Sequence, residues 1–403
     1  MKIVVLKFGG TSVGSLNRIK KVAKLIEKYS KKYKVIVLTS AMSGTTNKLI
    51  KMSKIVSKNF PDYEYDTLVS AGEQISCSLL SGQLVENGIK SRSWMAWQIP
   101  IITEGKHKFA RISSINKKEI LKYLKSGGIP VIAGFQGIND QQRITTIGRG
   151  GTDASAIMFA NFFNAFRCVI YTDVEGVYTT DPKKLKSARK IRSISYEEML
   201  EMASLGAKVM QPHSIQDARL NRIDIEVKSS FVNKTGTLIT KRKNIINNKI
   251  ITGVSSTENE AKVTLIGVKD RPGIAASIFK PLYKNSINVD MVVQNISSDN
   301  KKTDLTFTIK SNDLNRTKKI ISSNKNIIFE RMIFDKFVAK VSIIGVGMIT
   351  TPGVTFRMFQ TLATNNINIL VISTSEIKIS VLINKKNLHK AVKALHKEFN
   401  LHK

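Results

Sequence analysis

Short apolar runs alternate with amphipathic stretches through the first 240 residues, and this alternation limits the possible folds more than any other feature. The run Lys2–Leu6 leads into a glycine pair, and the runs Val35–Leu38, Ile129–Ala133 and Cys168–Tyr171 also end in loops rich in glycine or hydroxyl residues. Strands that alternate with helices predict a mostly parallel sheet covered by helices on both faces. Ligands in such folds bind where the strands end, so these loops are the expected place for a site.

The first of the expected helices has a clear start signal. Ser15 stands where its side chain can cap the helix. The apolar residues that follow at helical spacing are Leu16, Ile19, Val22 and Ile26. We therefore expect a strand, a turn and a helix here, with these apolar residues on one buried face.

A different pattern follows the basic, asparagine-rich segment Lys241–Asn248, which we interpret as a linker. An apolar run precedes a Pro-Gly pair at Pro272 and again at Pro352, and an Ile-Asn pair follows each turn at the same distance, at Ile287 and Ile367. Two more strand-like runs complete each unit. The second half is therefore predicted to hold two tandem α+β units.

Composition limits the functional class. A chain of 403 residues is too long for a single hydrophobic core, so we expect more than one domain. The sequence lacks both a signal-peptide pattern and the roughly 20-residue apolar run that spans a bilayer, which predicts a cytoplasmic protein without membrane contact. Cys77 and Cys168 lie in apolar stretches and are expected to be buried free thiols. The net charge of +34 comes from lysines spread along the whole chain, so we favour a solvated basic surface over a nucleic-acid partner, which stays the minor alternative.

The chemistry begins at Lys7–Ser12, a lysine at the end of a buried strand followed by two glycines. Glycines let backbone N–H groups approach phosphate oxygens, and the lysine adds a mobile cation. The loop is neither a Walker A motif nor a G-x-G-x-x-G dinucleotide fingerprint. A tight turn with a lysine that reaches solvent is the alternative interpretation.

Three other loops carry polar groups suited to a site. Gly148–Asp153 surrounds an arginine with glycines, and helix capping explains Asp153 but not the glycine cluster. Thr172–Lys183 brings hydroxyls, acidic groups and a tyrosine to the end of a strand, where a plain surface turn is the alternative. Ser70–Gln74 is expected to open a helix, and the helix dipole alone could account for Glu73 in its first turn.

These segments recur together in one known family. The matching segments are Lys7–Ser12, Ser40–Asn47, Gly72–Glu73, Ala133–Gly137, Gly148–Asp153, Tyr171–Tyr178 and Glu198–Lys208. In this order they resemble aspartate kinase (aspartokinase). In the second half, Val289–Asn295 and Ile372–Glu376 are similar to the effector-binding segments of that family's paired ACT domains. The resemblance spans nearly the whole chain.

The resemblance implies an α/β amino-acid-kinase fold for residues 1–245, followed by two α+β ACT domains of βαββαβ type at 246–335 and 336–403, which can share strands. It implies ATP-dependent phosphorylation of the side-chain carboxylate of L-aspartate to 4-phospho-L-aspartate, with Mg²⁺. This reaction is the first step of lysine, threonine and methionine biosynthesis. A carboxylate with a pKa near 4 is already ionised at neutral pH, so it needs no general base to become the nucleophile.

Matching the sequence to the family's motifs assigns three sets of site residues. Those expected at phosphoryl transfer are Lys7, Asp153 and Lys208. Those expected around ATP are Lys7, Gly9, Gly10, Ser12, Thr172, Asp173, Tyr178, Asp181, Lys183 and Lys208. Those expected around aspartate are Ser40, Thr45, Thr46, Glu73, Arg149, Gly150, Gly151 and Asp153. Arg149 suits a substrate carboxylate and Glu73 suits the ammonium group.

The ACT pair implies feedback control by lysine, threonine or both, although the pair could persist only as a scaffold. The residues expected around an effector are Asp270, Gly273, Ile274, Ala275, Asn288, Asp290, Gln294, Asn368, Ile369, Ser375 and Glu376. Exposed edges of ACT sheets favour a homodimer. Some relatives add a short subunit that starts internally, but this chain has no methionine between Met210 and Met291.

Two rival functions stay open from the residues alone. Another amino-acid kinase, acting on glutamate, N-acetylglutamate or UMP, would share Lys7 and its glycines but should lack Ser40–Asn47 and the ACT tandem. A non-catalytic amino-acid sensor would keep the ACT half and lose Lys7 or Asp153, which this chain retains.

Overall fold

The computed structural model describes the whole chain except residues 1, 208, 243–244, 246–248, 297–301 and 325. It divides into two compact units. The first unit comprises Met1–Val177 and Lys190–Asn247, and the second comprises Tyr178–Arg189 and Asn248–Lys403. The expected linker, Lys241–Asn248, lies mostly outside the described residues. No described helix is long and apolar enough to cross a membrane.

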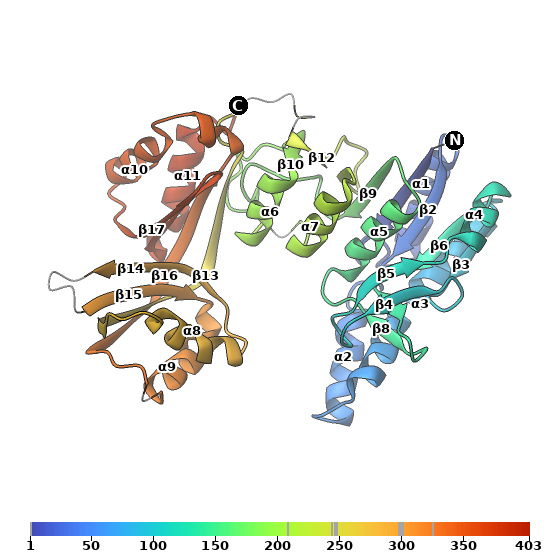
Figure 1. Cartoon of the computed structure of the whole chain (residues 1–403). Helices are drawn as coiled ribbons and strands as arrows, with labels where there is room; N and C mark the ends of the chain where they lie inside the picture. The colour runs from blue at the N-terminus through green and yellow to red at the C-terminus, as the bar shows by residue number, and fades with distance from the viewer. Residues whose placement is uncertain (1, 208, 243–244, 246–248, 297–301, 325) are drawn as a thin grey trace. The chain divides into compact units, whose positions relative to one another are not determined.

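An eight-stranded sheet forms the centre of the first unit, and its strands run mostly parallel, as predicted (Figure 1). The strand order is β10-β12-β11-β9-β1-β2-β6-β3. The bounds are β1 Ile3–Phe8, β2 Lys34–Thr39, β3 Ser91–Trp94, β6 Ile129–Ala133, β9 Arg167–Thr172, β10 Ser193–Ser195, β11 Ile225–Ser229 and β12 Thr237–Thr240. Strand β11 pairs with β12 in the antiparallel sense. The continuous apolar runs of β1, β2 and β6 are buried because helices cover the sheet.

Seven α-helices are described in the first unit. They are α1 Leu16–Ser30, α2 Thr45–Val56, α3 Asp62–Glu86, α4 Lys118–Lys125, α5 Gly151–Phe162, α6 Tyr196–Ser204 and α7 Pro212–Asn221. Ser15 caps α1 as predicted, since its side chain accepts the Arg18 N–H, and Ile19, Val22 and Ile26 are buried. The expectation for Leu16 is wrong: it is the first helical residue, lies outside the core cluster and is 61% exposed.

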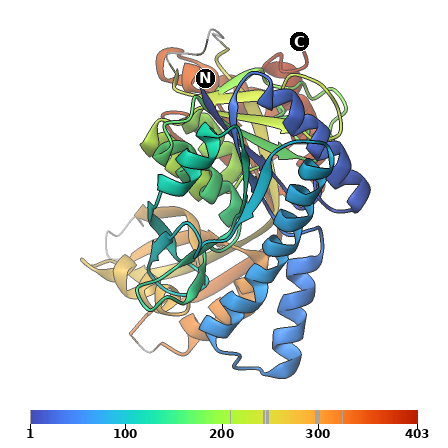
Figure 2. The same ribbon diagram turned by 90° about the vertical axis from the view of Figure 1, so that its right-hand side faces the viewer.

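A smaller four-stranded sheet, in the order β5-β4-β7-β8, stands beside the long helix α3. Its strands are β4 Ile101–Glu104, β5 Arg111–Ile115, β7 Gln136–Ile138 and β8 Ile144–Thr146. Figure 2 shows α2 and α3 in blue, running side by side. Cys77 of α3 and Cys168 of β9 are buried free thiols, as expected, and burial raises the pKa of Cys77 to about 12.

The second unit contains one six-stranded antiparallel sheet with the order β14-β15-β13-β16-β18-β17. Its strands are β13 Gly253–Lys269, β14 Val289–Ile296, β15 Lys302–Ile309, β16 Arg331–Ile344, β17 Ile369–Ser375 and β18 Lys378–Asn384. Its α-helices are α8 Ile274–Lys284, α9 Leu314–Ser322, α10 Val354–Thr364 and α11 Leu388–Glu398. The long strands β13 and β16 pair with each other, so both sequence repeats contribute to one sheet.

Each sequence repeat has its own apolar core. Helices α8 and α9 pack on β13 and β15, whereas α10 and α11 pack on β16 and β18 (Figure 1). Gly273 and Gly353 precede α8 and α10 with the same left-handed φ of 86°, which glycine adopts without strain. The repeated Pro-Gly turns therefore start equivalent helices.

One stretch of the amino-terminal half, Tyr178–Arg189, belongs to the second unit. The Thr179 carbonyl accepts the Val254 N–H at 2.7 Å, and the Thr179 hydroxyl lies 2.9 Å from Nε2 of His396. Nε of Arg189 donates to the carbonyl of His402 at 2.8 Å. This stretch is thus hydrogen-bonded to the start of β13 and to the carboxyl-terminal end of the chain.

Candidate active site

A cavity of about 730 Å³ opens in the first unit, where β1, β2 and β6 end. The loops that follow these strands line it together with the start of α5, which is where an α/β sheet is expected to bind a ligand. The predicted site residues that line it are Lys7, Gly10, Ser40, Thr46, Glu73, Arg149, Gly150, Gly151 and Asp153. We call this cavity the strand-end pocket.

A buried ion pair lies in the strand-end pocket. Nζ of Lys7, on β1, is 2.6 Å from Oδ1 of Asp153, in the first turn of α5. Each residue is only 8% exposed. Asp153 therefore neutralises Lys7 and holds its ammonium at the end of β1, where an incoming phosphoryl group could use the same cation.

The two glycines after β1 have separate tasks. The Gly9 N–H donates to the carbonyl of Tyr171 at 3.0 Å, which joins this turn to β9. Gly10 lines the pocket, and among the described residues its N–H has no acceptor. A Cβ at Gly10 would lie 2.7 Å from the Ala41 carbonyl oxygen, so only glycine fits there.

The loop before α5 is built from glycines in the left-handed region. Gly148 has a φ of 82° and Gly150 a φ of 74°, and Gly151 starts the helix. The left-handed backbone of this loop thus explains why glycines stand there, which helix capping by Asp153 does not. Arg149 stands exposed on this loop and lines the pocket, with no partner among the described residues. It is free to bind a carboxylate.

Glu73 lies in the pocket but not at a helix start, so that expectation is wrong. The helix begins at Asp62, after Pro61, and Glu73 falls in its interior. Gly72, next to Glu73, allows close packing: a Cβ there would lie 2.7 Å from Cβ of Ala41. The helix dipole therefore cannot account for Glu73.

The Glu73 carboxylate is only half satisfied. Oε1 accepts the Ala41 N–H at 3.0 Å, whereas the buried Oε2 has no partner among the described residues. The residue is 3% exposed, and burial raises the pKa of this carboxyl to about 7. A buried acceptor without a donor is costly, and a ligand ammonium would supply the missing donor.

The hydroxyl residues after β2 are divided. Ser40 and Thr46 line the strand-end pocket. Thr45 is not among its lining residues in the described part of the chain; it is the first residue of α2, and its methyl group faces α3 at Gly72.

Apart from Lys7 and Gly10, the described residues expected around ATP do not line the strand-end pocket. Ser12 is buried, and its hydroxyl accepts from Ser230 at 2.9 Å. The Thr172 hydroxyl, at the end of β9, donates to Asp173 at 3.1 Å. Within the described residues, neither of these pairs lines the cavity.

The remaining nucleotide candidates belong to the second unit or are not described. Tyr178, Asp181 and Lys183 stand in the 178–189 stretch, where the Asp181 carboxylate accepts the Lys183 N–H at 2.9 Å. Lys208 lies outside the described residues.

The expected effector residues of the first repeat surround the start of α8 and strand β14. Asp270 follows β13, Gly273 caps α8, Ile274 and Ala275 begin it, Asn288 precedes β14, and Asp290 and Gln294 stand on that strand. Asn288 and Gln294 are exposed. Asp290 instead pairs with the buried ammonium of Lys340, which also lies 3.2 Å from Glu260.

The second repeat holds the equivalent residues at β17. Asn368 precedes the strand, Ile369 begins it, Ser375 ends it and Glu376 follows. Strands β14 and β17 approach each other, because Met291 and Val371 share a small apolar cluster.

Several residues that line the pocket were not predicted as site residues from the sequence. They are Ala41, Met42, Ser43, Gly44, Asn47, Ile50, Tyr65, Lys108, Phe109, Phe135, Gly148, Thr146 and Thr152. Many belong to segments already singled out, but Tyr65 lies on α3, and Lys108 and Phe109 lie in the hairpin between β4 and β5. Nothing in the local sequence marks that hairpin as part of a site.

Comparison with known proteins identifies the family. Residues 2–229 match the amino acid kinase family, and residues 263–324 and 341–399 match the ACT domain. The chain is 44% identical over 404 residues to an aspartate kinase of Pseudomonas putida, covering 100% of this chain and 98% of that protein. An aspartokinase 2 of Bacillus subtilis is 40% identical over 405 residues, covering 100% of this chain and 99% of its own.

Solved structures share the fold. Aspartate kinase from Synechocystis matches with 35% identity and a TM-score of 0.57, covering 99% of this chain and 69% of that one. E. coli aspartokinase III in complex with lysine and aspartate matches with 24% identity and a TM-score of 0.82, covering 99% and 100%. With the full-length identity to the Pseudomonas enzyme, the predicted amino-acid-kinase fold with ACT domains is confirmed, and this chain belongs to the aspartokinase family.

Proposed function

We propose that the strand-end pocket is where this aspartokinase transfers the γ-phosphoryl group of ATP to the side-chain carboxylate of L-aspartate, giving 4-phospho-L-aspartate and ADP. The observation that carries the proposal is that one cavity contains both a buried lysine for phosphate and a buried carboxylate, Glu73, with one oxygen that lacks a donor among the described residues. A phosphate and an amino acid are the two ligands that such a pair would accept.

Phosphoryl transfer to a carboxylate brings two anions together, so its main requirement is neutralisation of charge and alignment of the reacting groups. Lys7 supplies the cation at the transferring group, and Asp153 keeps its ammonium in place while no phosphate is bound. The Gly10 N–H adds a donor in the same pocket. These groups act most strongly as charge develops in the transition state.

The acceptor is recognised by one anion and one cation. The unpartnered Oε2 of Glu73 accepts the substrate ammonium, and Arg149 takes a substrate carboxylate. Ser40 and Thr46 offer hydroxyls in the same pocket. An N-acetylated acceptor carries no ammonium and would leave the Glu73 carboxylate unsatisfied, which argues against the N-acetylglutamate alternative.

The donor set fits a magnesium ion that is carried mainly by the nucleotide. The described residues contain no group of three His, Cys, Asp or Glu side chains that could hold a metal ion alone. Mg²⁺ typically needs only one or two protein carboxylates besides phosphates and water, and Asp173 at the end of β9 would be such a ligand. When bound, Mg²⁺ would neutralise phosphate charge.

A hydroxamate assay tests the proposed function directly. Hydroxylamine traps an acyl phosphate, so the purified protein is incubated with ATP, Mg²⁺ and L-aspartate, L-glutamate or N-acetylglutamate in parallel. We expect ATP-dependent hydroxamate with L-aspartate, with much lower turnover on the other two. Turnover with N-acetylglutamate equal to that with aspartate would contradict the role of Glu73.

The ACT unit is proposed to bind lysine, threonine or both as inhibitors at the residues around α8 and β14. The exposed polar side chains there support this proposal. We further propose a homodimer, which light scattering tests together with a denaturing gel; a stoichiometric second band at about one third of the full mass would contradict it.

A further inference from the structure

The hairpin between β4 and β5 forms one wall of the strand-end pocket. Lys108 and Phe109 at its tip line the cavity. The Ala110 N–H donates to the carbonyl of Thr146 at 3.0 Å, which ties the hairpin to β8. A Cβ at Gly148 would lie only 2.9 Å from the Lys108 carbonyl oxygen, so the hairpin also touches the loop that carries Arg149.

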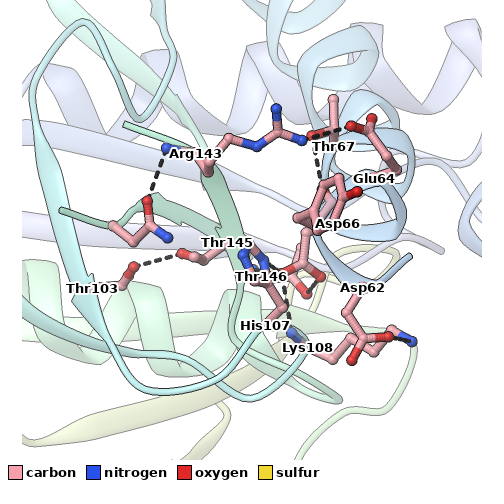
Figure 3. A network of polar contacts seen from close by, with 12 residues as sticks. Asp62, Glu64, Asp66, Thr67, Thr103, His107, Lys108, Arg143, Thr145 and Thr146 are labelled. Carbon is pink, nitrogen blue, oxygen red and sulfur yellow. Dashed lines mark hydrogen bonds and ion pairs between the residues drawn. The ribbon is translucent and has the colours of Figure 1, made fainter. Parts of the chain in front are cut away.

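A single carboxylate behind this wall holds three elements together. Asp66 of α3 is completely buried. Its Oδ2 lies 2.7 Å from Nδ1 of His107 and accepts the backbone N–H groups of Lys108 and Thr146, both at 3.0 Å. Its Oδ1 accepts the Thr146 hydroxyl at 2.6 Å. Figure 3 shows these contacts converging on Asp66 from the hairpin and from β8.

Lys108 is held in an unusual conformation by this network. Its φ of 69° lies in the left-handed region, which costs a residue with a Cβ free energy. Its N–H is fixed by Asp66, while its ammonium pairs with Asp62 and lies 4.4 Å from the centre of the Tyr65 ring. Neighbouring residues thus fix both the backbone and the side-chain ammonium of this strained lysine at the pocket wall.

We propose that Asp66 is a positioning residue for the amino-acid acceptor. It does not line the pocket itself, but it fixes Lys108 and Phe109 and, through Gly148, the loop of Arg149. This inference rests on the proposed function, in which Arg149 and Glu73 bind aspartate in the strand-end pocket. Among the described residues, the nucleotide candidates Thr172 and Asp173 make no hydrogen bond to this network, so ATP binding should be largely independent of it.

Two substitutions separate the hydrogen bonds from the charge. In Asp66→Ala all four contacts are lost. In Asp66→Asn the amide oxygen can replace Oδ2 as acceptor of the three N–H groups, while the amide NH₂ donates to the Thr146 hydroxyl oxygen. We expect Asp66→Ala to raise KM for aspartate about tenfold or more, because small misplacements of binding groups are costly, with KM for ATP changed by less than about twofold. Asp66→Asn should restore most of the aspartate affinity.

Thr145→Val is the matched control. Thr145 neighbours Thr146 on β8 and is equally buried, but its hydroxyl bonds to Thr103 at 2.5 Å instead of to Asp66. This variant should lower the melting temperature without raising KM for aspartate. An unchanged KM for aspartate in Asp66→Ala, or an equal rise for aspartate and ATP, overturns the proposal. A wild-type protein that does not phosphorylate aspartate refutes the proposed function instead.

Limited trypsin digestion gives a readout that does not depend on activity. The hairpin offers cleavage sites after Lys106, Lys108 and Arg111. Below the melting temperature of every variant, Asp66→Ala should be cut in the hairpin at least several-fold faster than the wild type, and Asp66→Asn and Thr145→Val should not. Equal cleavage rates in all four proteins would show that Asp66 does not hold the hairpin.

Discussion

Nζ of Lys7 and Oδ1 of Asp153 lie 2.6 Å apart in the strand-end pocket, and both side chains are about nine-tenths buried. A desolvated pair of this kind is balanced only while both partners are present. The lysine has one neutralising partner before phosphate arrives, and a bound phosphoryl group would offer it a second. The same lysine would therefore serve both in binding the phosphoryl group and in its transfer.

Replacement of Lys7 should affect turnover most. Lys7→Met keeps much of the side-chain volume but removes the cation, so kcat should fall by about 100-fold or more while KM for ATP changes less. Steady-state kinetics measure both constants. Because Asp153 would lose its partner, urea unfolding of the same variant should also show lower stability. Turnover near the wild-type value in a folded variant would rule out the assignment.

Glu73 predicts a pH dependence of aspartate use. Burial raises its pKa to about 7, and only the ionised carboxylate attracts an ammonium group. With decreasing pH, kcat/KM for aspartate should therefore fall about tenfold per pH unit below about pH 7, and it should level off above that pH. Glu73→Gln should have a lower kcat/KM and lack this inflection. A Gln variant with the wild-type profile would assign the titration to another group.

Arg149 should determine aspartate affinity. It is exposed, lines the pocket and has no partner among the described residues, so Arg149→Ala removes a binding group without breaking an internal contact. KM for aspartate should rise roughly 10- to 100-fold, as expected for a lost charged hydrogen bond, and KM for ATP much less. Equal increases for both substrates would mean that Arg149 serves the nucleotide.

Lys340 predicts a stability effect in the second unit. Its side chain is 5% exposed and lies beside the Glu260 side chain, which is 9% exposed, and burial raises the pKa of Glu260. Lys340→Met leaves that carboxylate buried without a cation, which should cost about 3–5 kcal/mol of unfolding free energy. Adding Glu260→Gln should recover much of the loss. Urea unfolding tests this, and additive effects of the two substitutions would contradict it.

Gln294 tests the proposed effector site. It is exposed on β14, far along the chain from the strand-end pocket residues. We expect lysine, threonine or both to inhibit the wild type, and Gln294→Ala to weaken inhibition without changing the uninhibited kcat. Each amino acid is titrated alone and together with the other. Absence of inhibition at millimolar concentrations would favour a scaffold role for the ACT pair.

The parts of the site that could be predicted are those with a local signature. Lys7 with its glycines and Gly148–Asp153 each combine a strand end, a glycine loop and a helix start within a few residues, so their chemistry is visible in the sequence. Similarly, the paired Pro-Gly turns revealed the repeat that forms one six-stranded sheet.

The parts that could not be predicted depend on contacts between distant segments. Tyr65 and Lys108 meet because α3 packs beside the β4–β5 hairpin, and Asp66 joins residues up to 80 positions apart. The helix start expected at Ser70–Gln74 was wrong for the same reason, since Gly72 allows the close approach of Ala41 to the interior of α3. The spacing of residues within one segment does not predict contacts with a distant segment.

The hydrogen bonds of Tyr178–Arg189 bear on how the ACT pair could be transferred between proteins. A polypeptide cut near residue 249 would keep both repeats but lose Thr179 and Arg189, so Nε2 of His396 and the Val254 N–H would lack their present partners. A chimaera that grafts the ACT pair onto another kinase therefore keeps these hydrogen bonds only if the 178–189 segment is transplanted with it.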